Sequence, residues 1–314
     1  MRKFLINIIV FTSSTIVLYV LLIIFFGTYL SWYSKNLPYH LESNMAKRMK
    51  EVVKLKGVDL LILGSSHAYR GYDVRIFSHN GYNTFNFGTS SQTPQQTEFL
   101  FKKYYLNIKP KFVIVDVYPF LYGKDGIEST TNIISNTKFD SDIASLALHT
   151  KNVEVYNTTI FSVFKQLKGD LSNFTKKEDA VKTDHYITGG YVETFKTSKL
   201  PDKYPPSKYE ILPKQLESFT NVIAILKNNK IPYIIVQAPI YKKRYAAITN
   251  MKYVDSVFKQ LGPYYNFNEI LSIPDKGFKD DSHMNQVGVN IFNNKVLELL
   301  HSVTKPSTSI VAIN

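Results

Sequence analysis

A long uncharged stretch opens the chain and limits what its first helix can be. No charged residue occurs between Phe4 and Ser34, and the run Ile16–Phe26 reads IVLYVLLIIFF. A helix needs roughly 20 apolar residues to cross the bilayer core. The stretch exceeds the roughly 7–15 apolar residues of a signal peptide, and no small-residue cleavage site follows it. We therefore expect residues 1–34 to form a retained transmembrane anchor rather than a cleaved signal.

The charges around this anchor indicate its orientation and surroundings. Arg2 and Lys3 favour a cytoplasmic amino terminus, although basic residues on the other flank weaken that preference. We favour a single-pass protein of the plasma membrane with its domain outside the cytoplasm. The net charge of +13 suits an anionic membrane surface or an anionic envelope polymer. No nucleic-acid partner is expected, because the anchor separates the domain from nucleic acid and no recognition motif occurs.

Beyond the anchor, short apolar runs alternate with helical patterns. Hydrophobic residues make up 44% of the chain and charged residues 20%, which suits a packed core. Alternation of this kind predicts an α/β fold with a doubly wound, mostly parallel, flavodoxin-like sheet, whose ligands bind beyond the carboxyl ends of the strands. The expected strands are Val58–Leu63, Tyr82–Phe87, Lys111–Val117 and Ile231–Ala238, and the expected helices cover Pro94–Leu106, 212–226, 253–261 and 289–299.

The same patterns divide the chain into parts. Residues 35–55 are expected to be a juxtamembrane linker with a short amphipathic helix, and residues 56–303 the main domain. The polar stretch 121–206 interrupts the alternation of strands and helices. Compact domains rarely contain a plain loop of that length, so we interpret it as an inserted lid or substrate-binding subdomain. Residues 304–314 are expected to be a partly disordered tail.

The first candidate for chemistry is the sequence Gly64-Ser65-Ser66 at the end of the first strand. A serine where a parallel strand turns into a helix lies at the carboxyl edge of the sheet, and its amide at the helix amino terminus favours negative charge. The same position also suits a serine that only caps the helix. The motif alone leaves both interpretations open.

The second candidate precedes the last helix. Asp280 lies three residues before His283, so it can hold the imidazole by one ring nitrogen and leave the other to accept a serine proton. An exposed loop histidine with capping aspartates is the alternative. The chain has no cysteine, and its seven histidines form no ligand-spaced pair. We expect neither a metal nor a cofactor.

Three sequence blocks together resemble the SGNH (GDSL-like) hydrolase superfamily. They read LILGSSHAYRG after the first strand, NFGTSSQ after the second and DDSHMNQVG before the last helix, and the resemblance runs from about residue 57 to 303. It implies that Ser66 is the nucleophile, His283 the general base and Asp280 its orienting partner. It also implies that the amides of Ser66 and Gly88 form the oxyanion hole.

The chain departs from the family pattern at two places. Ser65 stands where the family has an Asp before the nucleophile. The third block normally carries an Asn that completes the oxyanion hole, and this Asn is missing from the segment Asp116–Phe120. Loss of one such donor commonly lowers the rate by about 10²–10³. Asn86, Ser91 or a residue of the insertion could supply the missing hydrogen bond.

Other polar residues are candidates for the substrate rim. Arg70 follows Ser66 by four residues and could bind an anionic group, or it could form a salt bridge to Asp73 or Asp116. Two further rim candidates are Asp116, near the carboxyl end of its strand, and Asn86. The sequence Gly189-Gly190-Tyr191 could contact sugar, but we favour an ordinary turn there.

The anchor, GSSxxxRG and D-x-x-H-x-N together resemble the membrane-attached branch of the superfamily. That branch includes proteins of D-alanyl transfer to teichoic acid and of alginate O-acetylation. The resemblance implies a serine O-acyltransferase or carbohydrate esterase acting on an envelope polysaccharide, beside a membrane-bound O-acyltransferase. The alternative is a catalytically idle scaffold or polymer-binding partner that keeps the fold.

Overall fold

The computed structural model describes residues 1–30, 37, 39, 43–169 and 184–304. Their contacts form two compact units, one from residues 1–53 with 125–179 and one from residues 54–124 with 180–314. The expected insertion 121–206 is therefore not one subdomain, because its first part joins the amino-terminal segment and its last part joins the sheet. The expected tail lies outside the described residues beyond Thr304.

The larger unit is built on a five-stranded parallel sheet. The strand order is β2-β1-β3-β6-β7, which is the doubly wound 2-1-3-4-5 order when the strands are counted along the chain. The expected fold class is therefore confirmed. The strands are β1 (Val58–Leu63), β2 (Thr84–Asn86), β3 (Pro110–Asp116), β6 (Tyr233–Gln237) and β7 (Tyr264–Asn266).

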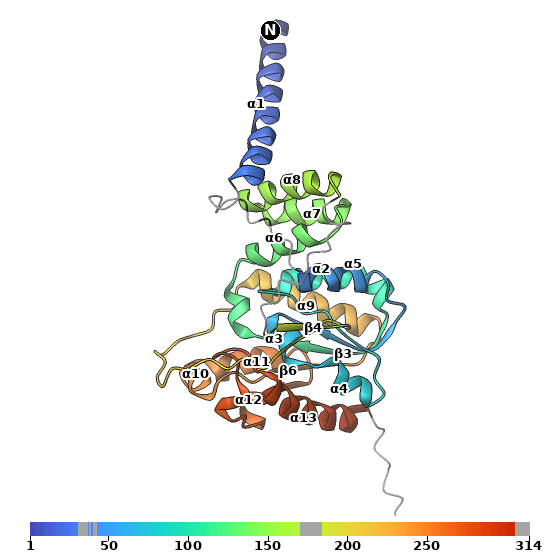
Figure 1. Cartoon of the computed structure of the whole chain (residues 1–314), viewed down its shortest axis with the longest axis vertical. Helices are drawn as coiled ribbons and strands as arrows, with labels where there is room; N and C mark the ends of the chain where they lie inside the picture. Colours follow the sequence, from blue (N-terminus) through green and yellow to red (C-terminus); the bar gives the residue numbers. More distant parts are fainter. Residues whose placement is uncertain (31–36, 38, 40–42, 170–183, 305–314) are drawn as a thin grey trace, which may run out of the picture. The chain divides into compact units, whose positions relative to one another are not determined.

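Helices cover both faces of this sheet, which explains why its central strands are apolar throughout. The helices α5 (Pro94–Ile108) and α9 (Pro213–Asn228) pack together on one face, and α13 (Gln286–Thr304) covers the other (Figure 1). The remaining helical segments are α3 (Ser66–Gly71), α4 (Val74–His79), η2 (Pro119–Gly123), α10 (Lys242–Ala246), α11 (Met251–Lys259), α12 (Phe267–Ile270) and η3 (Asp275–Gly277).

A small antiparallel hairpin, β4 (Asp184–Ile187) and β5 (Tyr191–Thr194), also belongs to this unit. Gly189 and Gly190 form its turn, with φ of +99° and +98°, a region that favours glycine. Tyr191 is buried and its hydroxyl donates to Gln286 Oε1 at 2.6 Å. The Gly-Gly-Tyr sequence is therefore an ordinary turn leading into a buried tyrosine, as we favoured, and not a sugar contact.

The smaller unit is helical. The helix α1 (Arg2–Tyr29) is long and apolar enough to cross a bilayer, a property that a signal sequence at this place would share. The other helices are α2 (Ser43–Val52), α6 (Ile127–Asn136), α7 (Ser141–Thr150) and α8 (Val153–Leu167). The helix α8 packs against α1, α6 and α7. The helix α2 packs against α6, so the expected linker contributes a helix to this unit.

Candidate active site

The candidate site lies where the strand order of the sheet reverses. Strand β1 pairs with β2 on one side and with β3 on the other, so the carboxyl end of β1 is the switch point at which doubly wound sheets bind ligands. Ser66 follows β1 at this point. Asp116 ends β3 beside it.

The turn between β1 and α3 assigns different roles to its two serines. Gly64 has a φ of +152°, and a Cβ there would lie 2.9 Å from the Cβ of Ala68 and 3.0 Å from the carbonyl oxygen of Asp116. Ser65 is the N-cap of α3, and its Oγ accepts from the amide of His67 at 3.3 Å. Ser66 is the first helical residue. The capping interpretation therefore applies to Ser65, and Ser66 is left as the candidate nucleophile.

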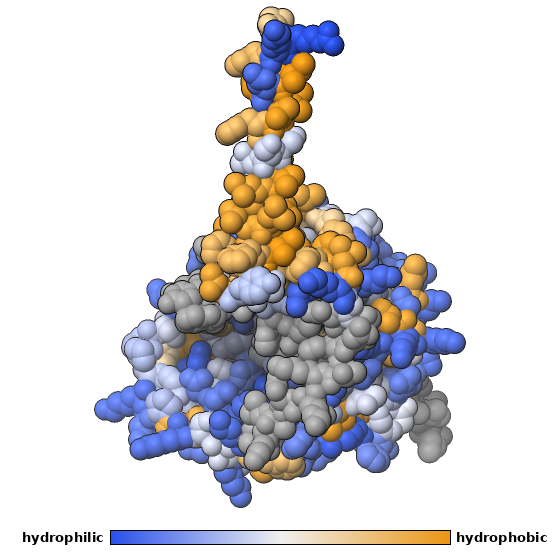
Figure 2. Space-filling model, turned by 45° about the horizontal axis from the view of Figure 1, so that its top comes forward, coloured by the Kyte–Doolittle hydropathy of each residue, from blue (hydrophilic) through white to orange (hydrophobic). Residues whose placement is uncertain are grey.

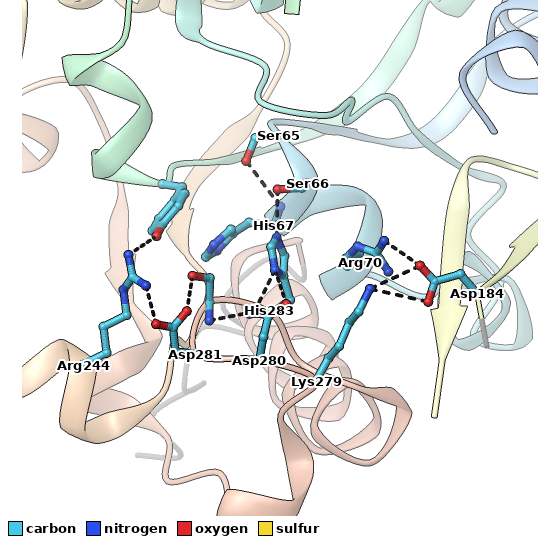
Figure 3. A network of polar contacts seen from close by, with 12 residues as sticks. Ser65, Ser66, His67, Arg70, Asp184, Arg244, Lys279, Asp280, Asp281 and His283 are labelled. Carbon is cyan, nitrogen blue, oxygen red and sulfur yellow. Dashed lines mark hydrogen bonds and ion pairs between the residues drawn. The ribbon is translucent and has the colours of Figure 1, made fainter. Parts of the chain in front are cut away.

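The hydroxyl of Ser66 meets a histidine from the other end of the domain. His283 Nε2 lies 2.9 Å from Ser66 Oγ, and His283 Nδ1 lies 2.9 and 3.1 Å from the two carboxylate oxygens of Asp280 (Figure 3). Because an ionised carboxylate only accepts hydrogen bonds, Nδ1 carries the proton and Nε2 accepts from the serine. The structure thus brings together the three residues that the sequence singled out.

Asp280 is held in its ionised form. Its burial acts to raise the pKa, but the hydrogen bond from the His283 ring and the amides of Ser282 and His283 outweigh this and hold the pKa of Asp280 well below its usual value. These amides donate to the same oxygen, Asp280 Oδ1, at 2.9 and 2.8 Å. The loop therefore fixes the carboxylate that orients the imidazole.

Contacts of α13 explain how positions 217 residues apart meet. Asn293 on α13 accepts from the amide of Asp73 at 2.7 Å and donates to the carbonyl of Gly71 at 2.6 Å. The ring of Phe292 packs edge-on against Tyr72, with centroids 5.1 Å apart. These contacts tie α13 to the end of α3, and the loop that carries His283 immediately precedes α13.

The loop after β2 also approaches the turn between β1 and α3, but its side-chain contacts differ from those expected of a substrate rim. A Cβ on Gly88 would lie 2.5 Å from the carbonyl oxygen of Ser65, so only glycine fits there. The Gly88 amide donates to Asn86 Oδ1 at 3.2 Å. The Asn86 Nδ2 group donates to the carbonyls of Ala68 and Tyr72 at 2.7 and 3.1 Å. Asn86 is thus a buried tie for α3, and the expectation that it lies on the rim is wrong.

Asp116 is likewise buried and does not line a rim. It accepts from the hydroxyl of Tyr72 at 2.9 Å, and burial raises its pKa to about 7. A cavity of about 20 Å³, the size of one water, borders Asp116, Gly64 and Ser65. The expected pairing of Arg70 with Asp73 or Asp116 is also wrong.

Arg70 instead joins a cluster that the sequence analysis did not include. Its Nη2 lies 2.7 Å from Asp184 Oδ2, and Lys279 Nζ lies 3.2 Å from the same oxygen (Figure 3). All three side chains are largely buried. Burial and the nearby Arg70 lower the pKa of Lys279. Because Asp184 begins the hairpin without a recognisable motif, no sequence signal pointed to it.

A second group flanks His283 on its other side. The ring of His67 stacks on Tyr118 with centroids 3.7 Å apart and lies 5.2 Å from the ring of His283. Burial and the neighbouring His283 hold the pKa of His67 well below its usual value, so it is neutral. Arg244 bonds to Asp281 at 2.6 Å and approaches the hydroxyl of Tyr118 at 3.4 Å.

Comparisons with known proteins found only distant likenesses. No family model and no curated protein matches the chain. Two similar solved structures are a candidate acylhydrolase from Bacteroides fragilis, at 11% identity and a TM-score of 0.40, and a GDSL-like lipase from Bacteroides thetaiotaomicron, at 13% and 0.39. The matches cover 85% and 88% of this chain and 100% and 99% of the other two. Likenesses this distant say nothing about the chemistry of this chain, which depends on its own side chains.

Proposed function

We propose that this protein is a membrane-anchored serine acyltransferase or esterase that acts on O-acyl groups through Ser66, His283 and Asp280. The observation that carries the proposal is the continuous hydrogen-bonded row from the Ser66 hydroxyl through both ring nitrogens of His283 to Asp280. A weakly nucleophilic hydroxyl becomes reactive when an adjacent base is itself oriented by a third group.

The reaction proceeds in two steps. His283 Nε2 takes the Ser66 proton while Ser66 Oγ attacks the acyl carbonyl, and the imidazolium then protonates the leaving alcohol or thiol. This leaves an acyl-Ser66 ester. In the second step His283 deprotonates water or a sugar hydroxyl, which attacks that ester and restores the free serine. Asp280 stays ionised throughout and stabilises the imidazolium.

The oxyanion would be held by the amides of Ser66 and Gly88. The Gly88 amide donates to Asn86 at the long distance of 3.2 Å, so it must turn from that oxygen toward the substrate. The Asn86 side chain is buried and donates to the carbonyls of Ala68 and Tyr72, so it does not replace the missing third donor. We therefore expect a slow enzyme in the absence of its physiological acceptor or partner, by about 10²–10³ relative to a complete hole.

An anionic envelope polysaccharide suits the acceptor. Arg70 and Lys279 share one carboxylate, Asp184, close to the candidate nucleophile. The chain as a whole carries a net charge of +13, which also favours an anionic polymer. The apolar helix α1 would hold the domain at the plasma membrane, on its outer side, where a membrane-bound O-acyltransferase could supply the acyl group.

A catalytically idle scaffold remains the second candidate because the Gly88 amide and the Asn86 side chain are bonded to protein atoms. A fluorophosphonate that labels active serines separates the two functions without knowledge of the substrate. We expect the full chain in detergent to be labelled, the Ser66→Ala variant to be unlabelled, and the Ser65→Ala variant to be labelled. Loss of the Ser65 cap lowers stability by about 0.5–2 kcal/mol without touching the nucleophile. An unlabelled but folded parent protein favours the scaffold.

A further inference from the structure

The helix α8 carries a second apolar face opposite its buried side, and contacts with its neighbours cover only part of this face. Its buried side consists of Val155, Thr158, Phe161 and Ser162. Spacings of three and four residues place another set on the opposite side of the helix. This set is Val153, Tyr156, Ile160, Phe164 and Leu167, called here the α8 stripe.

The outer part of the α8 stripe is exposed. Val153 is 53% exposed, Tyr156 36% and Leu167 84%. Ile160 and Phe164 are partly covered because they pack against the cluster of Ile23, Leu37 and Phe161. A solvated face would be polar, so this stripe needs a partner that accepts apolar groups along the helix.

The stripe is continuous with the apolar helix α1. The hydroxyl of Tyr19 on α1 donates to Asn157 Oδ1 on α8 at 2.5 Å. A Cβ on Gly27 would lie 2.5 Å from the ring of Phe161, so glycine permits the close crossing. Figure 1 shows α8 running across the foot of α1, and Figure 2 shows apolar surface beside that foot. A lipid that surrounds α1 therefore also reaches α8.

The contacts on α1 set the depth of α8. A bilayer core takes up roughly 20 residues of helix. The uncharged part of α1 begins at Phe4, so such a length ends near Ile23, and the contacts with α8 fall between Tyr19 and Gly27. The helix α8 thus crosses α1 at the boundary between acyl chains and headgroups. Amphipathic helices that lie in the membrane plane bury their apolar face about 5–10 Å into this boundary.

The neighbours of the stripe fit a membrane surface. Leu148, at the end of α7, is 65% exposed and adds an apolar side chain. Lys165 and Lys168 stand 5.9 and 4.7 Å from the ring centroids of Phe161 and Phe164. Lysines beside apolar rings can extend their ammonium groups to anionic headgroups while their stems stay against apolar surface.

We propose that α8 is an interfacial helix that lies in the outer boundary of the lipid bilayer beside α1, with Val153, Tyr156 and Leu167 inserted among the lipids. The proposal rests on the membrane anchor of the proposed function and not on its chemistry. The anchor then does not act as a free tether, because α8 fixes the helical unit flat against the lipid surface.

Fluorescence quenching by brominated lipids tests this contact. The chain has one tryptophan, Trp32, which follows the apolar run and reports anchor insertion. In a Trp32→Phe background, the Tyr156→Trp variant places a reporter on the stripe. The control is Tyr253→Trp on α11, where Tyr253 is 58% exposed. Full-length proteins are reconstituted in vesicles of phosphatidylcholine and phosphatidylglycerol, with bromine at shallow acyl carbons.

We expect the Tyr156→Trp variant to be quenched at least twofold more strongly than the Tyr253→Trp variant. Equal quenching of the two, with Trp32 of the parent quenched, would overturn the α8 proposal and leave the anchor standing. Protection of the Tyr156→Trp reporter from both brominated lipid and aqueous acrylamide would also overturn it, because a second protein would then cover the stripe. An unquenched Trp32 would refute anchor and proposal together. Fluorophosphonate labelling of Ser66 is independent of all these outcomes.

Discussion

The two sides of the candidate nucleophile Ser66 are built differently. On one side, Ser66, His283 and Asp280 form an uninterrupted row in which every polar atom already has its catalytic partner. On the other side, the amide of Gly88 donates to Asn86 Oδ1, and the Asn86 amide group donates to the carbonyl of Ala68 in α3. A base can be positioned before substrate arrives, whereas an oxyanion hole needs donors that are available to substrate. The difference predicts strong nucleophile activation combined with weak oxyanion stabilisation.

The largest effect is expected on the side of the row. Asp280→Asn should lower the kcat for a simple acetate ester by about 10³–10⁴, because the amide no longer fixes the tautomer of His283. Asp281→Asn is the matched control, since Asp281 bonds to Arg244 and not to His283. Steady-state kinetics of both variants measure the difference. Equal losses in the two variants would mean that the row is not catalytic.

The next effect concerns the Gly88 loop on the other side of Ser66 and is measured as a loss of stability. Gly88→Ala places a Cβ 2.5 Å from the carbonyl oxygen of Ser65, so the loop must move away from the nucleophile turn. Overpacking of this kind costs about 1–3 kcal/mol of the free energy of unfolding. Gly71→Ala is the control, because its nearest neighbour would be Met284 Cε at 3.6 Å. Thermal melts that show the two variants equally stable would contradict the close approach.

Asn86 sharpens the comparison because its two possible roles have different signatures. As a tie for α3, Asn86→Ala removes the hydrogen-bond partner of the buried Tyr72 carbonyl and of the Gly88 amide, and it should cost about 1–3 kcal/mol of unfolding free energy. As an oxyanion donor, it would instead lower kcat by about 10²–10³ with stability unchanged. We expect the first result. Urea unfolding and ester hydrolysis by the folded protein distinguish them, and Asn80→Ala, an exposed amide on the C-cap of α4, serves as control.

How well each part of the molecule can be predicted from sequence depends on whether its contacts are local. The strands β1 and β3 and the helix α13 carry strong apolar patterns, and the short spacing from Asp280 to His283 fixes their contact locally. By contrast, β7 has only three residues and carries no pattern of its own. The Asp184 partner of Arg70 and the stacking of His67 on Tyr118 depend on how distant segments pack, which no local spacing encodes.

Asp116 is buried although its position along β3 predicts a rim residue, and the reason is physical. Its position at the end of β3 resembles that of a rim residue, but the close approach of the Gly64 turn and the hydroxyl of Tyr72 enclose it. A carboxyl group in such surroundings is favoured in its protonated form, which is why its pKa rises to about 7. Position along a strand indicates which edge of the sheet a residue reaches, whereas burial depends on the segments that cover that edge.

The last effect follows from this buried carboxyl and depends on pH. In the unfolded chain Asp116 titrates near the ordinary aspartate pKa of 3.8, and in the folded protein its pKa is about 7. Between these values the folded state holds the proton more tightly, so this group makes the protein less stable as pH rises from about 4 to 7. Asp116→Asn should remove that slope while its amide oxygen still accepts from Tyr72. Because each pKa unit corresponds to about 1.4 kcal/mol, the variant should gain stability relative to the parent between pH 5 and pH 8.

Urea unfolding of parent and variant at these two pH values measures the gain from Asp116→Asn. An equal difference between the two proteins at both pH values would show that Asp116 titrates normally. Asp280 contributes with the opposite sign, since its lowered pKa adds stability that is lost only as pH falls below about 4. The two carboxyls can therefore be told apart, because Asp116 acts between about pH 4 and 7 and Asp280 below about pH 4.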